Sequence, residues 1–181
     1  MARLISAVLV SILLFSLTAC TGTPKDLEPV KQVDSARYLG TWYEIARLEH
    51  PFERGLEQIT AQYSARDDGG IDVLNRGYNP QKQSWDEAKG KAYFVDEANK
   101  DGSRIGHLKV SFFWPIYSGY NILVLDPNYQ YAMVSGPNRS YLWILSRTPQ
   151  LDKTNLEKLL AQAKAWGFAT EALIYTPQLK R

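Results

Sequence analysis

The stretch Tyr38-Leu39-Gly40-Thr41-Trp42-Tyr43-Glu44-Ile45-Ala46-Arg47 opens the first of eight strand-like segments in this chain. Threonine, tryptophan, tyrosine and isoleucine are enriched in β-strands, and Gly40 stands immediately before a run of them. Seven further segments of this kind follow at fairly even spacing, separated by residues that favour turns. The sequence predicts strands over residues 41–48, 57–66, 71–78, 84–95, 105–114, 119–126, 131–136 and 141–147.

Short turn sequences connect most of these segments. Asp67-Asp68-Gly69-Gly70, Asn79-Pro80, Asp126-Pro127-Asn128 and Gly136-Pro137-Asn138 are each short enough for a hairpin. No helical pattern lies between the strands, whereas parallel strands would need such a crossover. A long antiparallel sheet exposes its edges unless it closes, and eight strands close into a barrel that can hold one small ligand. We therefore predict an all-β fold, an eight-stranded antiparallel up-and-down barrel.

Side-chain size along two segments favours a barrel with internal space. Leu108, Val110 and Phe112 alternate with polar residues and therefore share one face. The face opposite the cations of residues 89–91 is small, because it carries Ala88, Gly90 and Ala92. A packed sandwich core would need bulk at such positions, so these residues are predicted to leave room. A glycine in a strand can also mark a bend, which stays an alternative for Gly90.

One amphipathic helix follows the last barrel strand. Thr154-Asn155-Leu156-Glu157 fits a capping box, and Gly167 with Phe168 fits a Schellman end. Between these ends, apolar residues recur at helical spacing: Leu156, Leu159, Leu160 and Ala163. A helix with a single apolar stripe needs one apolar surface, so we expect it to pack outside the barrel. A last short strand is predicted over residues 172–175.

The beginning of the chain has the pattern of a secretory signal. Arg3 precedes an uncharged apolar run over residues 4–19, which is shorter than the roughly 18 residues or more of a spanning helix. Residues 21–33 mix charges with glycine and proline and show no hydrophobic period. We therefore predict a signal peptide over residues 1–19, a lipidated N-terminus with a flexible tether over 20–33, and the barrel domain over 34–181.

The segment Leu17-Thr18-Ala19-Cys20 resembles a bacterial lipobox. The resemblance implies diacylglyceryl transfer to the Cys20 thiol, cleavage before Cys20 and acylation of the new amino group. Several acyl chains on one residue give stable membrane anchoring. An aspartate after the cysteine commonly retains such lipoproteins at the inner membrane, so Thr21 points to the outer membrane, with the barrel on its periplasmic face. A buried free thiol and an uncleaved anchor remain alternatives for Cys20.

Composition excludes several functional classes. Lys and Arg number 21 against 19 Asp and Glu, a net charge of +2 that argues against a nucleic-acid partner. One cysteine allows no intramolecular disulfide and no cysteine zinc cage. The two histidines, His50 and His107, are too far apart in sequence for a His-x-x-x-His metal site, and we predict both at the surface. We accordingly expect no enzymatic activity, no metal and no cofactor.

Two stretches carry a resemblance to the lipocalin family. They are residues 38–47, with Gly40-Thr41-Trp42, and Tyr141-Leu142-Trp143-Ile144-Leu145-Ser146-Arg147-Thr148-Pro149. Together with the lipobox they are similar to the bacterial lipoprotein lipocalins, which are close to apolipoprotein D. The resemblance implies that Trp42 plugs the closed end of the barrel and that Arg147 lies across its ring in a cation–π contact. It assigns a structural role to these two residues and to Gly40. Asp126-Pro127-Asn128-Tyr129 departs from the usual Thr-Asp-Tyr order of the family.

The resemblance also implies a ligand inside the barrel. Tyr141 and Trp143 share a face with Leu145, and comparison with the family places that face inside. Tyr120 is mildly preferred inside as well, although the residues of its strand do not fix the parity. The predicted ligand-binding wall comprises Ala88, Gly90, Ala92, Leu108, Val110, Phe112, Tyr120, Tyr141 and Trp143.

Two hypotheses about function follow. The first is a membrane-anchored lipocalin that sequesters or transports a fatty acid or lysophospholipid in the bacterial envelope. The second is an envelope interaction protein with a packed barrel and no ligand, whose exposed loop Trp114-Pro115-Ile116-Tyr117 meets a partner or a membrane. The sequence leaves open whether the chain forms a homodimer.

Overall fold

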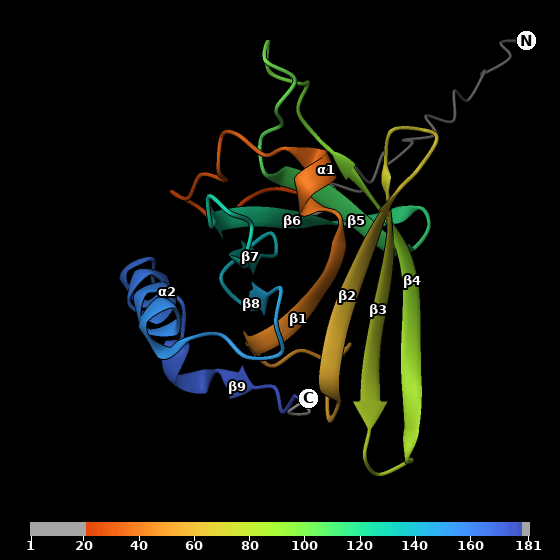
Figure 1. The fold of residues 1–181 in the computed structure, drawn as a ribbon, viewed down its shortest axis with the longest axis vertical. Helices are drawn as coiled ribbons and strands as arrows, with labels where there is room; N and C mark the ends of the chain where they lie inside the picture. Colours follow the sequence, from red (N-terminus) through yellow and green to blue (C-terminus); the bar gives the residue numbers. More distant parts are fainter. Residues whose placement is uncertain (1–20, 179–181) are drawn as a thin grey trace, which may run out of the picture.

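The computed structural model describes residues 21–178, and its central feature is a closed antiparallel barrel (Figure 1). Each strand pairs with the next along the chain, and β1 pairs with both β2 and β8, which closes the ring. The predicted eight-stranded barrel is therefore confirmed. Its strands are β1 (Gly40–Arg47), β2 (Glu57–Ala65), β3 (Ile71–Asn79), β4 (Ser84–Phe94), β5 (His107–Phe113), β6 (Ile116–Leu125), β7 (Tyr131–Ser135) and β8 (Leu142–Ser146).

Side-chain alternation along the strands divides the apolar residues into two clusters. One fills part of the barrel interior and includes Trp42, Leu108 and Leu145. The other lies between the outer wall and the C-terminal helix and includes Leu142 and Ile144. In β8 the face of Trp143 and Leu145 is therefore the inner one, as comparison with the family suggested.

Helix α2 (Lys153–Ala165) packs on the outside of the barrel (Figure 1). The predicted capping box at Thr154 is wrong: the cap is Asp152, whose carboxylate accepts a hydrogen bond from the backbone N–H of Asn155 at 2.9 Å. The helix begins earlier because an aspartate caps as well as threonine does. The predicted Schellman end is confirmed, since the Phe168 N–H donates to the Ala163 carbonyl and Gly167 has φ +79°.

Three short elements complete the described chain, one before the barrel strands and two after α2. Helix α1 (Ser35–Tyr38) precedes β1 and crosses one end of the barrel. The predicted last strand is shorter than expected, because η1 (Thr170–Ala172) occupies its beginning. β9 (Ile174–Tyr175) then pairs with the end of β1. None of the helices within residues 21–178 is long and apolar enough to cross a membrane.

Residues 21–33 do not form the predicted flexible tether. The Thr21 carbonyl lies 2.9 Å from His107 Nε2, and the Gly22 carbonyl accepts a hydrogen bond from the Asn121 side chain at 3.1 Å. Val33 is fully buried in the interior cluster. The composition is that of a tether, but the backbone of this segment finds partners on β5 and β6. The predicted signal peptide and Cys20 lie outside the described residues.

Candidate functional site

A large cavity occupies the barrel between its two ends, with a volume of about 990 Å³. β1 runs from the α1 end, at Gly40, to Arg47 at the other end. The loop of residues 48–56 that follows β1 therefore lies at the end away from α1, as does the turn that joins β3 to β4 (Figure 1). Residues from this loop, from the end of β5 and from the start of β6 line the outer part of the cavity. We call the α1 end the closed end and the opposite end the mouth.

Eight of the nine side chains predicted to face inward line this cavity. They are Ala88, Ala92, Leu108, Val110, Phe112, Tyr120, Tyr141 and Trp143. Tyr120 belongs to the interior cluster, which fixes the parity that the sequence of its strand left open. That these residues contact a ligand stays a prediction.

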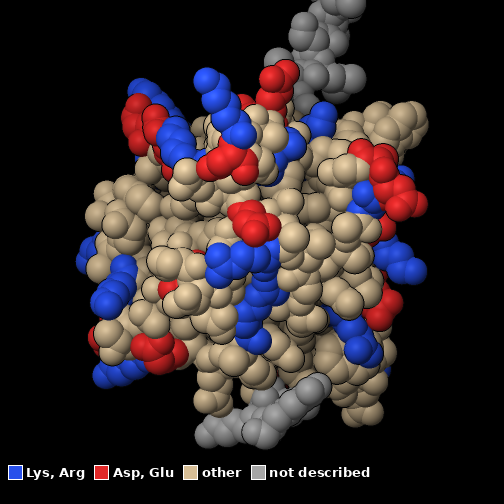
Figure 2. All heavy atoms as spheres, turned by 45° about the horizontal axis from the view of Figure 1, so that its top comes forward, with Lys and Arg blue, Asp and Glu red and all other residues tan. Residues whose placement is uncertain are grey.

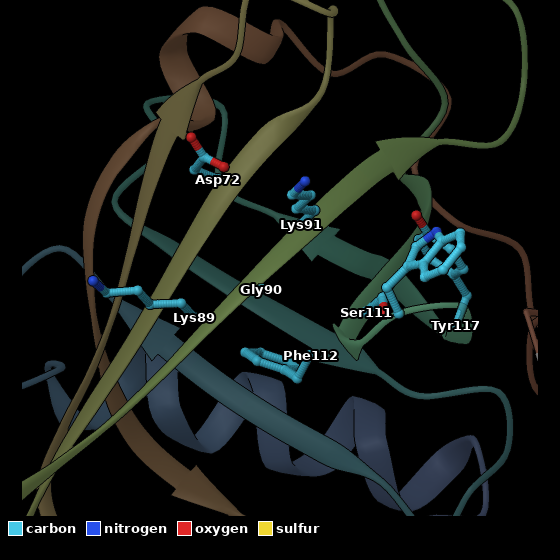
Figure 3. A pocket seen from close by; sticks show the side chains of 8 residues that line it. Asp72, Lys89, Gly90, Lys91, Ser111, Phe112 and Tyr117 are labelled. Carbon is cyan, nitrogen blue, oxygen red and sulfur yellow. The ribbon is translucent and has the colours of Figure 1, made fainter.

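Gly90 does not line the large cavity, so its predicted role is corrected. A methyl group on its Cα would come within 2.9 Å of the Phe112 ring and 2.8 Å of the Ser111 carbonyl oxygen. Gly90 instead borders a smaller hollow of about 200 Å³ at β4 and β5, where Figure 3 shows the Phe112 ring beside this stretch of β4. The space that the glycine leaves is therefore taken by an aromatic ring of the neighbouring strand. Ala88 and Ala92 remain the small residues of the cavity wall.

The closed end is sealed by an aromatic ring under a guanidinium group. Arg147 Cζ lies 3.9 Å from the ring centroid of Trp42, which is fully buried. The same guanidinium donates hydrogen bonds to the carbonyls of Arg37 (2.7 Å) and Thr41 (3.0 Å). Gly40 has φ +94°, and a Cβ there would lie 3.3 Å from Arg147 Nη1, so this position suits glycine on both counts. The cation–π contact that the resemblance implies is present.

Three tyrosine hydroxyl groups meet at the inner end of the cavity. The Tyr120 hydroxyl lies 2.7 Å from that of Tyr38 and 3.0 Å from that of Tyr63. Tyr38 also packs against the Trp42 ring at a centroid distance of 5.0 Å, which places the three hydroxyls next to the closed end. Burial is the main cause that raises the pKa of all three, to about 12 for Tyr63. We refer to Tyr38, Tyr63 and Tyr120 as the hydroxyl cluster.

A buried charged cluster lies toward the mouth. Arg47, only 1% exposed, donates to the Glu44 carboxylate at 2.8 Å and to the Glu53 carbonyl at 2.8 Å. Nε2 of His50 lies 2.9 Å from the Glu53 carboxylate, which also accepts from the Trp143 indole at 3.1 Å. These contacts tie the loop of residues 48–56 to β1 and β8. Within residues 21–178 no group of three or more acidic, histidine or cysteine side chains is placed to hold a metal ion.

The two carboxyl groups of this cluster have opposite pKa shifts. Burial, reinforced by the nearby Glu53 charge, raises the pKa of Glu44 to about 8 against the lowering effect of Arg47. Burial also acts to raise the pKa of Glu53, but hydrogen bonding and attraction from His50 outweigh it and lower that pKa below its usual value. Glu53 is therefore the ionised partner of the pair at neutral pH, and Glu44 holds a proton more readily.

With this geometry in view, comparison with known proteins decides the family. The family of lipocalin-like domains matches residues 33–178. The chain belongs to the lipocalin family. It is 52% identical over 177 residues to the outer membrane lipoprotein Blc of Vibrio cholerae, covering 97% of this chain and 99% of that protein. It is 47% identical over 178 residues to Blc of Escherichia coli, covering 97% and 98%.

More distant similarities are found to apolipoprotein D in sequence and to a solved structure in fold. Apolipoprotein D of Mus musculus is 29% identical over 172 residues, which cover 91% of this chain and 85% of that protein. The structure of insecticyanin from Manduca sexta superposes with a TM-score of 0.65 at 20% identity, covering 88% of each chain. The likeness to bacterial lipoprotein lipocalins and, at a distance, to apolipoprotein D is therefore confirmed.

Sequence reasoning missed the charged cluster of this lipocalin. His50 was predicted at the surface but is buried, because the loop that carries it folds over the cavity and pairs it with Glu53. Alternation from Trp42 does place Glu44 inside, so that signal was available. The inward position of Arg47 depends on a bulge between Glu44 and Ala46, which no residue pattern announces. His107, also predicted at the surface, is half-buried between Thr21 and Asp96.

The mouth of the lipocalin barrel carries exposed apolar side chains. Phe52 is 73% exposed, Phe113 75%, Trp114 82% and Ile116 73%. Phe52, Phe113 and Ile116 also line the cavity, so the apolar wall continues onto the rim. The face in Figure 2, which includes the closed end, has acidic and basic side chains interspersed. The mouth carries charged side chains beside these apolar ones, among them Arg76, Lys82 and Asp86.

Proposed function

We propose that this lipocalin binds a fatty acid or lysophospholipid and sequesters or transports it in the bacterial envelope. The observation that carries the proposal is the apolar cavity of about 990 Å³, which is at the large end of the range for small-molecule sites. Each methylene group that leaves water for such a wall contributes about 0.8 kcal/mol. A packed barrel, the alternative reading, would leave no such volume. The proposed activity is binding, without a catalytic step.

The polar head group of the ligand is proposed to lie at the mouth. Burying a charged or zwitterionic group deep in an apolar wall is costly unless it is paired. At the mouth the head group stays in contact with water and with polar lining residues such as Arg76 and Lys82. The acyl chain would then extend past Ala92 and Leu108 toward the closed end.

A bulky side chain on the cavity wall tests whether the acyl chain occupies the cavity. Ala92 is buried on β4 opposite Ile71 and Val110. Ala92→Trp is expected to weaken palmitic acid or lysophospholipid binding at least about tenfold, or 1.4 kcal/mol, because the indole takes the place of the chain. Calorimetric titration of the chain from Thr21 onward measures the affinity. The matched control is Ala98→Trp, which adds the same ring at an exposed position outside the cavity lining.

Two results would count against this site. If Ala92→Trp stays folded with unchanged affinity, the lipid binds elsewhere. If the unchanged chain binds no lipid and yields none to mass spectrometry after extraction, the result supports the alternative hypothesis of a barrel without a ligand. In that case the overfilled core should also lose about 1–3 kcal/mol of stability.

We further propose that Cys20 carries the lipid anchor and holds the barrel at the outer membrane, on its periplasmic side. Support comes from the lipobox at residues 17–20 and from the two relatives, each named an outer membrane lipoprotein. Cys20→Ala should abolish palmitate labelling and move the protein from the membrane fraction to unprocessed or released material. Radiolabelled palmitate and fractionation measure this, with Cys20→Ser as a second variant. Equal labelling of Cys20→Ala and the unchanged protein would exclude the anchor.

The exposed apolar rim supports a contact role beside ligand binding. Phe113, Trp114 and Ile116 project from the β5–β6 connection, in and beside the loop that the sequence singled out for an interaction. We propose that the partner is a second copy of this chain. In a symmetric homodimer through this rim, each copy would cover the exposed apolar side chains of the other. Sedimentation of the chain from Thr21 onward tests it.

A further inference from the structure

The hydroxyl cluster is a polar feature at the blind end of a cavity whose lining is mostly apolar, with its charged side chains toward the mouth. Tyr38, Tyr63 and Tyr120 all line the cavity, and the Tyr38 and Tyr63 rings stack at a centroid distance of 5.7 Å. Phenylalanine would fill the same volume at each position without burying a hydroxyl group. Burying three hydroxyls is costly unless each finds hydrogen-bond partners. The stability of the cluster therefore depends on how its hydrogen-bond donors and acceptors are used.

Counting protons shows that the cluster keeps one donor free. Three hydroxyl groups carry three protons, while the cluster contains two hydrogen bonds, both through Tyr120. Within residues 21–178 no other hydrogen-bond partner of these three hydroxyls is found. Whichever way the hydroxyls turn, one O–H has no acceptor. If Tyr120 accepts from both neighbours, the free proton is its own; otherwise it belongs to Tyr38 or Tyr63.

We propose that the hydroxyl cluster binds a neutral oxygen atom carried near the far end of the ligand chain. The chemical class is an acyl chain with a hydroxyl or keto oxygen at or close to its terminal carbon. This inference rests on the proposed lipid binding and deepens it, because it names a second polar contact at the end opposite the head group. The free O–H donates to the ligand oxygen, and a ligand hydroxyl can in turn donate to a lone pair of the cluster.

The same chemistry argues against a carboxylate at this end. One free O–H does not replace the hydration of an ionised group, and the guanidinium at the closed end, that of Arg147, is already engaged with the Trp42 ring and backbone carbonyls. A neutral oxygen needs only one or two hydrogen bonds to offset the loss of water. The cluster therefore discriminates by chain oxygenation and leaves the charged head at the mouth.

The test compares three probes on the chain from Thr21 onward: palmitic acid, its ω-hydroxy derivative and a derivative hydroxylated at mid-chain. In the unchanged protein the ω-hydroxy acid should bind at least as tightly as palmitic acid. The mid-chain derivative should bind about tenfold more weakly, because most of the wall between the mouth and the cluster is apolar. This comparison requires no variant.

Variants then assign the effect to the cluster. Changing all three tyrosines to phenylalanine (Y38F/Y63F/Y120F) keeps the shape of the wall, and removing both partners of a hydrogen bond together is nearly neutral for stability. In this variant the ω-hydroxy acid should bind about tenfold more weakly than palmitic acid. Y38F/Y63F keeps one hydroxyl with a free proton and should retain the original ratio. Tyr43→Phe, on β1 outside the cavity lining, is the matched control.

The outcomes separate this inference from the proposed function. Binding of palmitic acid with no preference between the ω-hydroxy and mid-chain derivatives would overturn the inference alone. Weaker binding of palmitic acid itself by the triple variant, with the ω-hydroxy ratio unchanged, would show that the cluster holds the carboxyl group and would also overturn it. Failure of the unchanged protein to bind any of the three acids would overturn the proposed function.

Discussion

Replacing Trp42 by alanine is expected to lower the free energy of unfolding by about 3–5 kcal/mol, because the indole is fully buried at the closed end of the barrel. The ring packs against Tyr38, and its N–H donates to the Tyr38 carbonyl at 2.9 Å. Its loss therefore leaves a void beneath Arg147 and an acceptor without its donor. Urea unfolding followed by far-UV circular dichroism measures the effect.

Arg147→Ala should cost about 2–4 kcal/mol, since it removes hydrogen bonds from a charged group as well as the cation–π contact. The carbonyls of Arg37, Thr41 and Tyr129 lie 2.7, 3.0 and 3.2 Å from the guanidinium nitrogens. Arg147→Lys is the matched variant: it keeps the charge but has no planar fork to span these acceptors, so most of the loss should persist.

The two sites should couple in a double-mutant cycle. Once the Trp42 ring is gone, the Arg147 guanidinium has no aromatic face at 3.9 Å to cover, so part of its contribution is already lost. The double variant should then be less destabilised than the sum of the single variants by about 1 kcal/mol, within the range typical of residues in contact. Additivity to within about 0.5 kcal/mol would contradict an energetic role for the pair.

The barrel was predictable because the turn and alternation signals of its strands agreed. Turn residues such as Asn79-Pro80 marked the hairpins, and alternation from Leu108 to Phe112 marked an inner face. The errors occur where a backbone segment finds partners that composition does not reveal. Residues 21–33 have a tether-like composition, yet their carbonyls are bound by β5 and β6. Asp152 caps α2 ahead of an equally plausible threonine.

The candidate site was predictable in its apolar part and less so in its polar part. Ala92, Leu108 and Trp143 follow from period-two alternation once the inner face is chosen. Gly90 does not, because the position of the neighbouring Phe112 ring decides whether a missing side chain leaves free space. The charged cluster depends on a bulge in β1 and on the path of the loop that brings His50 inside. Both are properties of the folded chain.

That charged cluster gives the second large expected effect. Arg47→Met keeps a side chain of similar length but removes the cation that faces Glu44, Thr176 and the Glu53 carbonyl. At pH 9 the free energy of unfolding should fall by about 3–5 kcal/mol, because breaking a buried ion pair from one side leaves an uncompensated charge. Urea unfolding at pH 9 and at pH 5.5 measures the change.

The loss should be smaller at pH 5.5, by about 1 kcal/mol or more. Glu44 has a folded-state pKa of about 8, above its ordinary value of 4.5, so the folded state holds its proton more tightly than the unfolded state does. The stability from this carboxyl is therefore fully present below pH 4.5 and is lost as the pH rises toward 8. At pH 5.5 the Arg47→Met protein can keep Glu44 neutral, which avoids the buried unpaired charge. Glu53, whose pKa is lowered, contributes its pH dependence below 4.5 and does not interfere.

Glu44→Gln provides the matched control for this pH dependence. The amide accepts hydrogen bonds from Arg47 and Thr176 but does not titrate, so the decline of stability between pH 5.5 and 8 should be reduced in this variant. In the Glu44→Gln background, Arg47→Met should cost less at pH 9 than it does alone, because no carboxylate is left unpaired. An equal cost of Arg47→Met at both pH values, with or without Glu44, would show that Arg47 stabilises the mouth through packing of its stem and its bond to the Glu53 carbonyl, and not through the charge of Glu44.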